Sequence, residues 1–314
     1  MSNYTKILQN DSFYRERRNK SEAIVLKLKD EMAKELKDYQ ISIFVVGSLA
    51  RNEVGDNSDL DIFLISKNEI PNLEQIHIFS KLIEINKRLN FPPFSNDGQF
   101  LTIHNLQDLK NKAGYPEDDS LNLFTTRMLM ILESKVIYNE KLYREILSEI
   151  IEHYLRDRQG HDEFKPLFLL NDVLRFWRTL CLNYEALRHD TDRPWRKKNI
   201  NLKYSRLITV FSTVLTIVNK QDITHNDILE ICNKTPIERI TWALENMDDT
   251  FLDSYIILLN HYKKFLEAKE EGNIEDNLEL KQILNKNAID FSKIIFSFLN
   301  SNSIDMKLKQ FLVI

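Results

Sequence analysis

The spacing of apolar positions changes several times within the first 105 residues. Over residues 11–39 apolar residues recur every three or four positions among many charges, which predicts an amphipathic helix. Shorter apolar runs follow, rich in β-branched residues and bounded by turn-forming residues, as is typical of strands. The expected strands are 41–46, 60–65 and 99–104, and a helix is expected at 73–89.

Beyond about residue 120 the apolar spacing predicts helices and no strand. The expected helices are 119–132, 140–154, 171–187, 203–218, 223–232, 236–244, 251–266 and 289–299. Asn171 and Asp172 are interpreted as a capped helix start, and the acidic stretch 267–279 as an exposed hinge. The predicted fold class is therefore α+β: a small mixed sheet with helices over 1–140, followed by an all-helical domain over 141–314.

Composition and charge limit the classes of function. The chain of 314 residues has 43 basic and 47 acidic side chains, so it does not coat nucleic acid through overall positive charge. Residues 188–206 hold seven basic and two acidic side chains, which marks a local site for a polyanion. Two cysteines are too few for a disulfide framework. Without a signal peptide or an apolar membrane span in this sequence, we expect a soluble cytoplasmic protein and no membrane partner.

Candidate chemistry is concentrated around two expected strands. Gly47-Ser48 ends the first, and after ten residues Asp59-Leu-Asp61 opens the second. Because strand side chains alternate between faces, Asp59 and Asp61 should project from the same side. Two neighbouring carboxylates repel each other unless a cation neutralises them, and Mg²⁺ or Mn²⁺ suits oxygen ligands. Gly47 would let the backbone approach a phosphate, to which the Ser48 hydroxyl could donate.

The fuller string over 47–61, Gly-Ser-X-Ala-Arg-X-Glu-X4-Ser-Asp-X-Asp, resembles the signature of the DNA polymerase β-like nucleotidyltransferase superfamily. It is most similar to the branch of the PII-protein uridylyltransferases, which has its own residues of the same type at Arg51, Glu53 and Ser58. An aspartate pair at 118–119 and Arg127 on the following helix extend the likeness to about residue 145. Further on, 201–206 faintly resembles the helical substrate-binding domain of other members.

The resemblance implies transfer of a nucleoside monophosphate from an NTP such as ATP to a hydroxyl group, with release of pyrophosphate. Asp59 and Asp61 would hold the metal ion. The residues implied to contact the nucleotide are Gly47, Ser48, Arg51 and Ser58. Many members add a third carboxylate from a later strand, for which Asp97 is the nearest candidate, although it could equally serve as a turn or capping residue.

The acceptor is left open by the sequence. The resemblance favours a protein side-chain hydroxyl, and thus AMP or UMP transfer, in a chain without recognisable phosphohydrolase or sensor domains. Alternatives are an RNA such as a tRNA 3′ end, bound through 188–206, or a toxin-like module. A catalytically silent nucleotide-binding regulator and an enzyme with a small-molecule acceptor are further alternatives. Lys203 and Arg206, which would share a helical face, are the candidate phosphate contacts of this patch.

Overall fold

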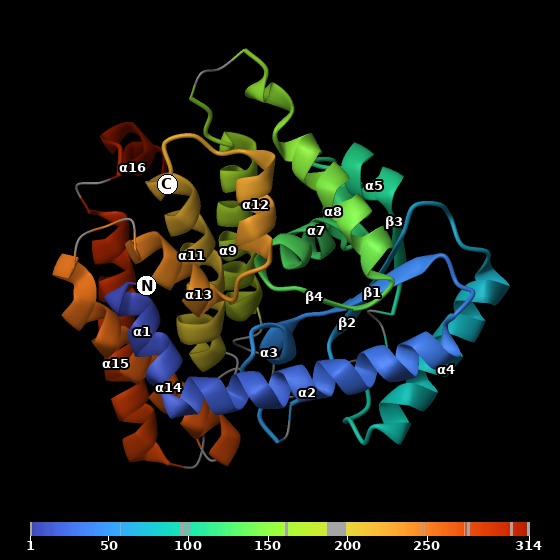
Figure 1. The fold of residues 1–314 in the computed structure, drawn as a ribbon, viewed down its shortest axis with the longest axis horizontal. Coiled ribbons are helices and arrows are strands. Elements are labelled where there is room, and N and C mark those ends of the chain that lie inside the picture. The colour runs from blue at the N-terminus through green and yellow to red at the C-terminus, as the bar shows by residue number, and fades with distance from the viewer. Residues whose placement is uncertain are drawn as a thin grey trace. The chain divides into compact units, whose positions relative to one another are not determined.

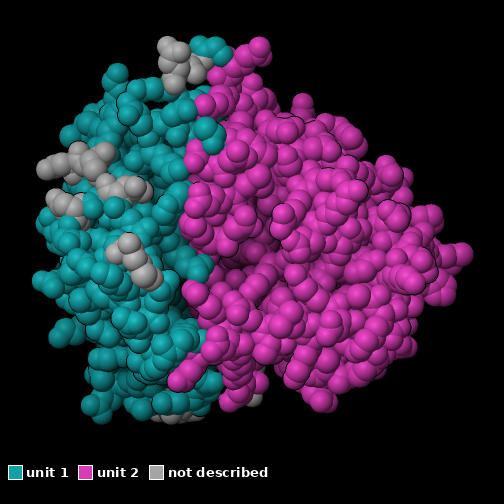
Figure 2. Space-filling model, viewed as in Figure 1, with its two compact units in different colours: residues 1–15, 160–224, 236–314 teal, residues 16–159, 225–235 magenta. Residues whose placement is uncertain are grey.

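The computed structural model describes residues 2–56, 58–94, 98, 101–160, 163–186, 199–245, 247, 249–272, 274, 277–301 and 304–312. It divides into two compact units, which Figure 2 shows in different colours. The helical unit comprises 1–15, 160–224 and 236–314, and the sheet unit comprises 16–159 and 225–235.

The sheet unit is built on four strands of mixed direction. They are β1 (Ile41–Val45), β2 (Ile62–Ser66), β3 (Ile103–Asn105) and β4 (Lys135–Tyr138), in the order β3-β2-β1-β4. The central strand β1 pairs antiparallel with both β2 and β4, whereas β2 and β3 run parallel. Together with the helical region that follows, this small mixed sheet confirms the predicted α+β class.

Helices cover both faces of this sheet (Figure 1). On one face, α2 (Ser12–Glu35) and α4 (Asn72–Arg88) share a buried apolar cluster with alternate strand residues. Members of that cluster are Leu28, Met32, Ile43, Val45, Ile62, Leu64, Ile78 and Leu82. Because side chains alternate, Phe44 and Phe63 lie on the other face, where their rings stack with centroids 5.7 Å apart. Phe44 also contacts Tyr143 of α8 (Glu140–Tyr154), so α8 covers this second face.

Short helices complete the sheet unit. In chain order they are α3 (Gly47–Ala50), α5 (Leu106–Asn111), α6 (Pro116–Ser120), α7 (Leu123–Leu132), η2 (Arg156–Arg158) and α12 (His225–Cys232). The last of these comes from a distant part of the sequence and packs against α7 and α8. His225 Nε2 lies 3.0 Å from Ser148 Oγ of α8, which fixes the start of α12. The sheet unit is thus not one continuous stretch of chain.

The described part of the helical unit contains helices and no strand. They are α1 (Asn3–Asn10), α9 (Leu167–Ala186), the π-helical η4 (Leu202–Arg206), α11 (Leu207–Asn219), α13 (Pro236–Glu245), η5 (Asp249–Phe251), α14 (Leu252–Glu271), α15 (Leu278–Leu299) and α16 (Met306–Leu312). Aromatic rings fill its core, where Tyr204 stacks on Phe265 at a centroid distance of 4.6 Å. Within the described ranges, no helix has both the length and the apolar character that crossing a bilayer requires.

Several local predictions were wrong. The helix expected over 119–132 is divided into α6 and α7, because Asn122 between them adopts a left-handed conformation with a φ of +58°. The helix expected over 289–299 is α15, which already begins at Leu278. Strand β4 was not expected, because its four residues are too few to show a strand period and it depends on pairing with β1. Helix α9 begins at Leu167 rather than at Asn171, since Pro166, which needs no hydrogen bond for its nitrogen, precedes its first turn. Helix α14 continues through the first part of the expected hinge and ends at Gly272, whose φ of +72° forms a left-handed cap.

Candidate functional site

The turn after β1 brings Gly47 and Asp61 together. The Val46 N–H donates to the Asp61 carbonyl at 3.0 Å, so the two chain segments stay paired just beyond the strands. Gly47 has a φ of +70°, a conformation that favours glycine. A Cβ atom at this position would lie 3.0 Å from Asp61 Oδ2. The carboxylate therefore lies against the turn, in space that any other residue would occupy.

Backbone hydrogen bonds hold this turn tightly. The Arg51 N–H donates to the Gly47 carbonyl at 3.1 Å, and the Glu53 N–H donates to the Ser48 carbonyl at 2.8 Å. Gly47 is buried, whereas Ser48 is only half-buried, at the second position of the short helix α3. Ser48 thus stands at the edge of a turn whose backbone is fixed.

The two predicted metal ligands lie immediately before β2, which begins at Ile62. Leu60 between them is buried in the cluster with α2 and α4, so alternation directs Asp59 and Asp61 towards the opposite side. Asp59 is exposed and Asp61 is half-buried, so solvent reaches both side chains. Carboxylate oxygens are ligands that suit Mg²⁺, and the glycine turn beside them leaves room for a phosphate on that ion. Among the residues that the structure describes, no group of three or more His, Cys, Asp or Glu side chains could hold a metal, and Asp97 lies outside them.

The Arg51 side chain is directed into the protein. Its guanidinium is buried and donates from Nε to Glu53 Oε2 at 2.8 Å, and from a terminal nitrogen to Glu133. Glu133 immediately follows α7, and its side chain is also buried. Breaking a buried ion pair leaves an uncompensated charge, so these contacts fix the turn strongly. Sequence reasoning missed Glu133, because a separation of 82 residues carries no spacing signal.

A second buried arginine holds the same segment from the side of α2. Arg17 donates to the carbonyls of Glu53 and Val54 at 3.1 and 3.4 Å, and Ser21 Oγ accepts from the Val54 N–H at 3.3 Å. Both α2 residues are buried. The backbone between the glycine turn and Asp59 is therefore anchored to a long helix, which the sequence did not indicate.

The loop that leads to Asp59 has its own internal bond. The Gly55 N–H donates to Ser58 Oγ at 3.0 Å, and Lys20 of α2 forms an ion pair with Asp56. Ser58 is half-buried. Its hydroxyl thus supports the loop immediately before the first carboxylate of the pair.

Lys203 and Arg206 belong to the helical unit, whereas Asp59 and Asp61 belong to the sheet unit. Both cations lie in the π-helical turn η4. Lys203 Nζ donates to Asn285 Oδ1 at 2.7 Å, and burial lowers the pKa of this lysine. The rest of the predicted basic patch, up to residue 198, lies outside the described residues.

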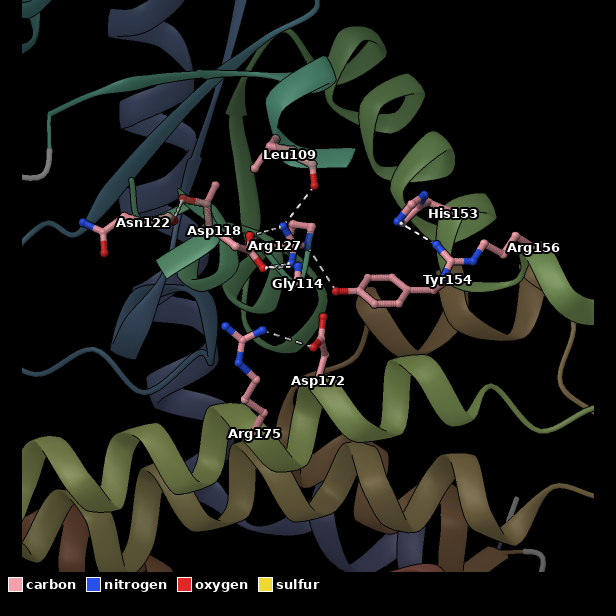
Figure 3. Close-up of polar contacts among 11 residues, drawn as sticks. Leu109, Gly114, Asp118, Asn122, Arg127, His153, Tyr154, Arg156, Asp172 and Arg175 are labelled. Atoms are coloured by element: carbon pink, nitrogen blue, oxygen red, sulfur yellow. Dashed lines mark hydrogen bonds and ion pairs between the residues drawn. The ribbon is translucent and has the colours of Figure 1, made fainter. Parts of the chain in front are cut away.

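The aspartate and arginine that extended the sequence likeness contact each other directly. Figure 3 shows the Arg127 guanidinium in the centre of a polar network, held by Asp118 through two hydrogen bonds of 2.6 and 2.8 Å. Arg127 also donates to the Leu109 carbonyl at 3.0 Å and to the Tyr154 hydroxyl at 3.2 Å. Burial alone lowers the pKa of Arg127, but the bonds to Asp118 and Tyr154 outweigh it and raise the pKa above its ordinary value. This charged pair joins α5, α6, α7 and α8 inside the unit.

Comparison with protein-family models identifies the segment that carries this site. Residues 25–122 match the model described as the nucleotidyltransferase domain. The matched range contains the glycine turn, Asp59, Asp61 and strands β1 to β3. A search of the curated proteins found no match for the chain.

Proposed function

We propose that this protein, whose residues 25–122 form a nucleotidyltransferase domain of the DNA polymerase β-like superfamily, uses a divalent metal ion to modify other proteins. It would move a nucleoside monophosphate from an NTP to a side-chain hydroxyl and release pyrophosphate. One observation carries the proposal: Asp61 Oδ2 lies 3.0 Å from where a side chain of residue 47 would begin. The carboxylate and the open backbone of the turn therefore form one surface, suited to a phosphate and its cation.

Asp59 and Asp61 would hold Mg²⁺ or Mn²⁺, which when bound activates the attacking hydroxyl and stabilises charge on the leaving oxygen. Gly47 contributes by lacking a side chain, which lets the backbone come close to the triphosphate. Ser48, at the edge of the same turn, can donate its hydroxyl to a phosphate oxygen. The site thus works mainly by positioning charged groups, as is usual for phosphoryl transfer.

Arg51 and Ser58, also predicted as nucleotide contacts, form hydrogen bonds within the protein next to the site. Arg51 is buried against Glu53 and Glu133, so we propose that it positions the Gly47 turn rather than binding the nucleotide. Ser58 holds the loop before Asp59 through the Gly55 N–H. Both residues belong to the string that resembles the PII-uridylyltransferase branch, which supports AMP or UMP transfer to a protein.

The helical region would present the acceptor protein. Lys203 and Arg206 are the residues we propose for contacts with acidic groups of that acceptor. In support, Lys203 has a pKa lowered by burial, so an approaching anion would regain electrostatic stabilisation there. The same two cations could serve an RNA acceptor, which the following experiment distinguishes.

The test incubates the purified protein and Mg²⁺ with each α-³²P-labelled NTP and with cell lysate separated into protein and RNA fractions. We expect label on a protein band with the unmodified chain and none with Asp59→Asn or Asp61→Asn. Asp30→Asn, which removes an exposed carboxylate of α2, is the matched control and should label normally. Label on RNA would contradict the protein acceptor, and NTP binding without any transfer would favour a silent regulator.

A further inference from the structure

A separate cavity of about 400 Å³ lies in the sheet unit, within the size range of small-molecule pockets. Its walls come from α2, from residues 54–56 and 58 of the loop, and from residues 88–92 at the end of α4. Of the residues assigned above to the nucleotide or the metal ion, Ser58 is among the lining residues, whereas Gly47, Ser48, Asp59 and Asp61 are not. The side chains that line the cavity can therefore be considered as a separate ligand site.

One wall carries positive charge. Lys20, Ile24 and Lys27 follow one another at intervals of four and three residues, so they share one face of α2. Lys20 pairs with Asp56 at the cavity wall, where the Lys20 side chain is 38% exposed and the Asp56 side chain is largely exposed, at 77%. Lys27 is exposed, and no ion pair or hydrogen bond of its side chain is found among the described residues. An anion in the cavity would therefore meet the Lys27 ammonium directly, and Lys20 only in exchange for its ion pair with Asp56.

The third cation is already neutralised. Arg88 donates to Glu31 at 2.6 Å and to Glu35 at 2.9 Å, so its charge is committed to α2. The cations of α2 that a ligand would contact are thus Lys27 and, in exchange for Asp56, Lys20.

Another part of the lining contains apolar side chains. Leu89, Phe91 and Pro92 line the cavity where the chain leaves α4, and Leu89 and Phe91 pack against the apolar cluster of the sheet. An aromatic ring beside a proline offers a flat apolar surface that can contact a planar group. A ligand with a ring at one end and an anionic group at the other would match both sides.

We propose that this cavity binds a small organic anion with a planar ring, of the class of nucleoside monophosphates. The phosphate contacts Lys20 and Lys27, and the ring lies against Phe91 and Pro92. Lys20 exchanges its pairing with Asp56 for the ligand, so Asp56 competes with binding. The proposal is independent of the transfer reaction, because it involves neither the metal ion nor the glycine turn.

The test is calorimetric titration of the full chain with AMP in the presence of EDTA. The Asp59→Asn, Asp61→Asn double variant is used in parallel, so that binding at the proposed metal site does not contribute. We expect AMP to bind both proteins equally, and Lys27→Ala to weaken binding about tenfold through loss of one phosphate contact. Asp56→Asn should tighten binding severalfold, because it removes a negative charge that competes with the ligand for Lys20. Lys34→Ala, which removes a lysine of the same helix outside the cavity, should leave the affinity unchanged.

Two further titrations examine the two halves of the ligand. Inorganic phosphate and adenosine should each bind at least about tenfold more weakly than AMP, since each reaches one side only. The proposal is overturned if AMP does not bind, if the double variant abolishes binding, or if Lys27→Ala and Asp56→Asn leave the affinity unchanged. Equal binding of phosphate and AMP would likewise overturn it. The opposite signs expected for the two variants exclude a general loss of folding as the cause.

Discussion

The sheet unit places aspartates in two contrasting settings. Asp118 is completely buried and held by two hydrogen bonds from the Arg127 guanidinium. Asp59 is exposed and Asp61 half-buried, beside a glycine turn that leaves room for a ligand. A carboxylate inside a protein needs a cation from the chain itself, whereas a carboxylate open to solvent can take a metal ion. The same residue type therefore stabilises the fold in one place and is available for chemistry in the other.

Removing the internal cation should have the largest effect on stability. Arg127→Met leaves the Asp118 carboxylate buried without its partner, and we expect a loss of about 3–5 kcal/mol in the free energy of unfolding. Urea unfolding followed by circular dichroism measures this. Combining it with Asp118→Leu should recover most of the loss, because no charge is then left buried. A loss below about 1 kcal/mol in the single variant would show that the pair is not needed by the fold.

Substitution in the exposed pair, Asp59 and Asp61, should lower activity and leave stability almost unchanged. Asp61→Asn is expected to lower Mg²⁺-dependent transfer by about 10²–10³-fold, because a charged ligand of the metal ion is replaced by a weak one. Its free energy of unfolding should change little, since the carboxylate is not buried. Initial rates of label transfer and urea unfolding of the same preparation measure both quantities. Transfer at the normal rate in Asp61→Asn would show that Asp61 does not hold the metal ion.

His104 of β3 is another buried titratable side chain, and its burial makes stability depend on pH. Burial lowers its pKa from 6.5 to about 4, although nearby Asp108 acts in the opposite direction. The unfolded chain therefore takes up a proton at a higher pH than the folded chain, and stability is lost as the pH falls from about 6.5 to about 4. We expect a contribution of about 2–3 kcal/mol over this window. Between pH 7 and pH 4, the free energy of unfolding should fall less steeply in His104→Gln than in the unmodified protein. Equal slopes in the two proteins would contradict the role given to His104.

The close approach of Gly47 to Asp61 is the subtlest feature to test. Gly47→Ala adds a Cβ atom at a φ of +70° and 3.0 Å from Asp61 Oδ2. Gly114→Ala is the matched control, since its φ is +84° but nothing lies within 4 Å of the added atom. Backbone strain should lower the free energy of unfolding of both variants by about 1 kcal/mol. Gly47→Ala should lose about 1 kcal/mol more and should also transfer the nucleotide more slowly. Equal stability and activity in the two variants would indicate that the turn and the carboxylate do not constrain each other.

Local patterns predicted much of the secondary structure and the candidate metal pair. The helix predicted at 140–154 has the same bounds as α8, and the bounds of strands β1 and β2 lie within two residues of the expected 41–46 and 60–65. Each of these segments carries its own period of apolar residues, which does not depend on the rest of the chain. Strand β4 lacks such a period, because it exists through its pairing with β1.

The amino-acid sequence by itself determined the α+β class and the glycine-serine turn that precedes two carboxylates by a fixed interval. Only the tertiary structure decided that Arg51 is buried between Glu53 and Glu133, that Arg17 holds the loop backbone, and that α12 packs in the sheet unit. Periodicity and short motifs depend on neighbouring residues and can therefore be recognised along the chain. Pairing of buried charges and packing of distant helices depend on which surfaces meet after folding, and sequence spacing carries no record of that.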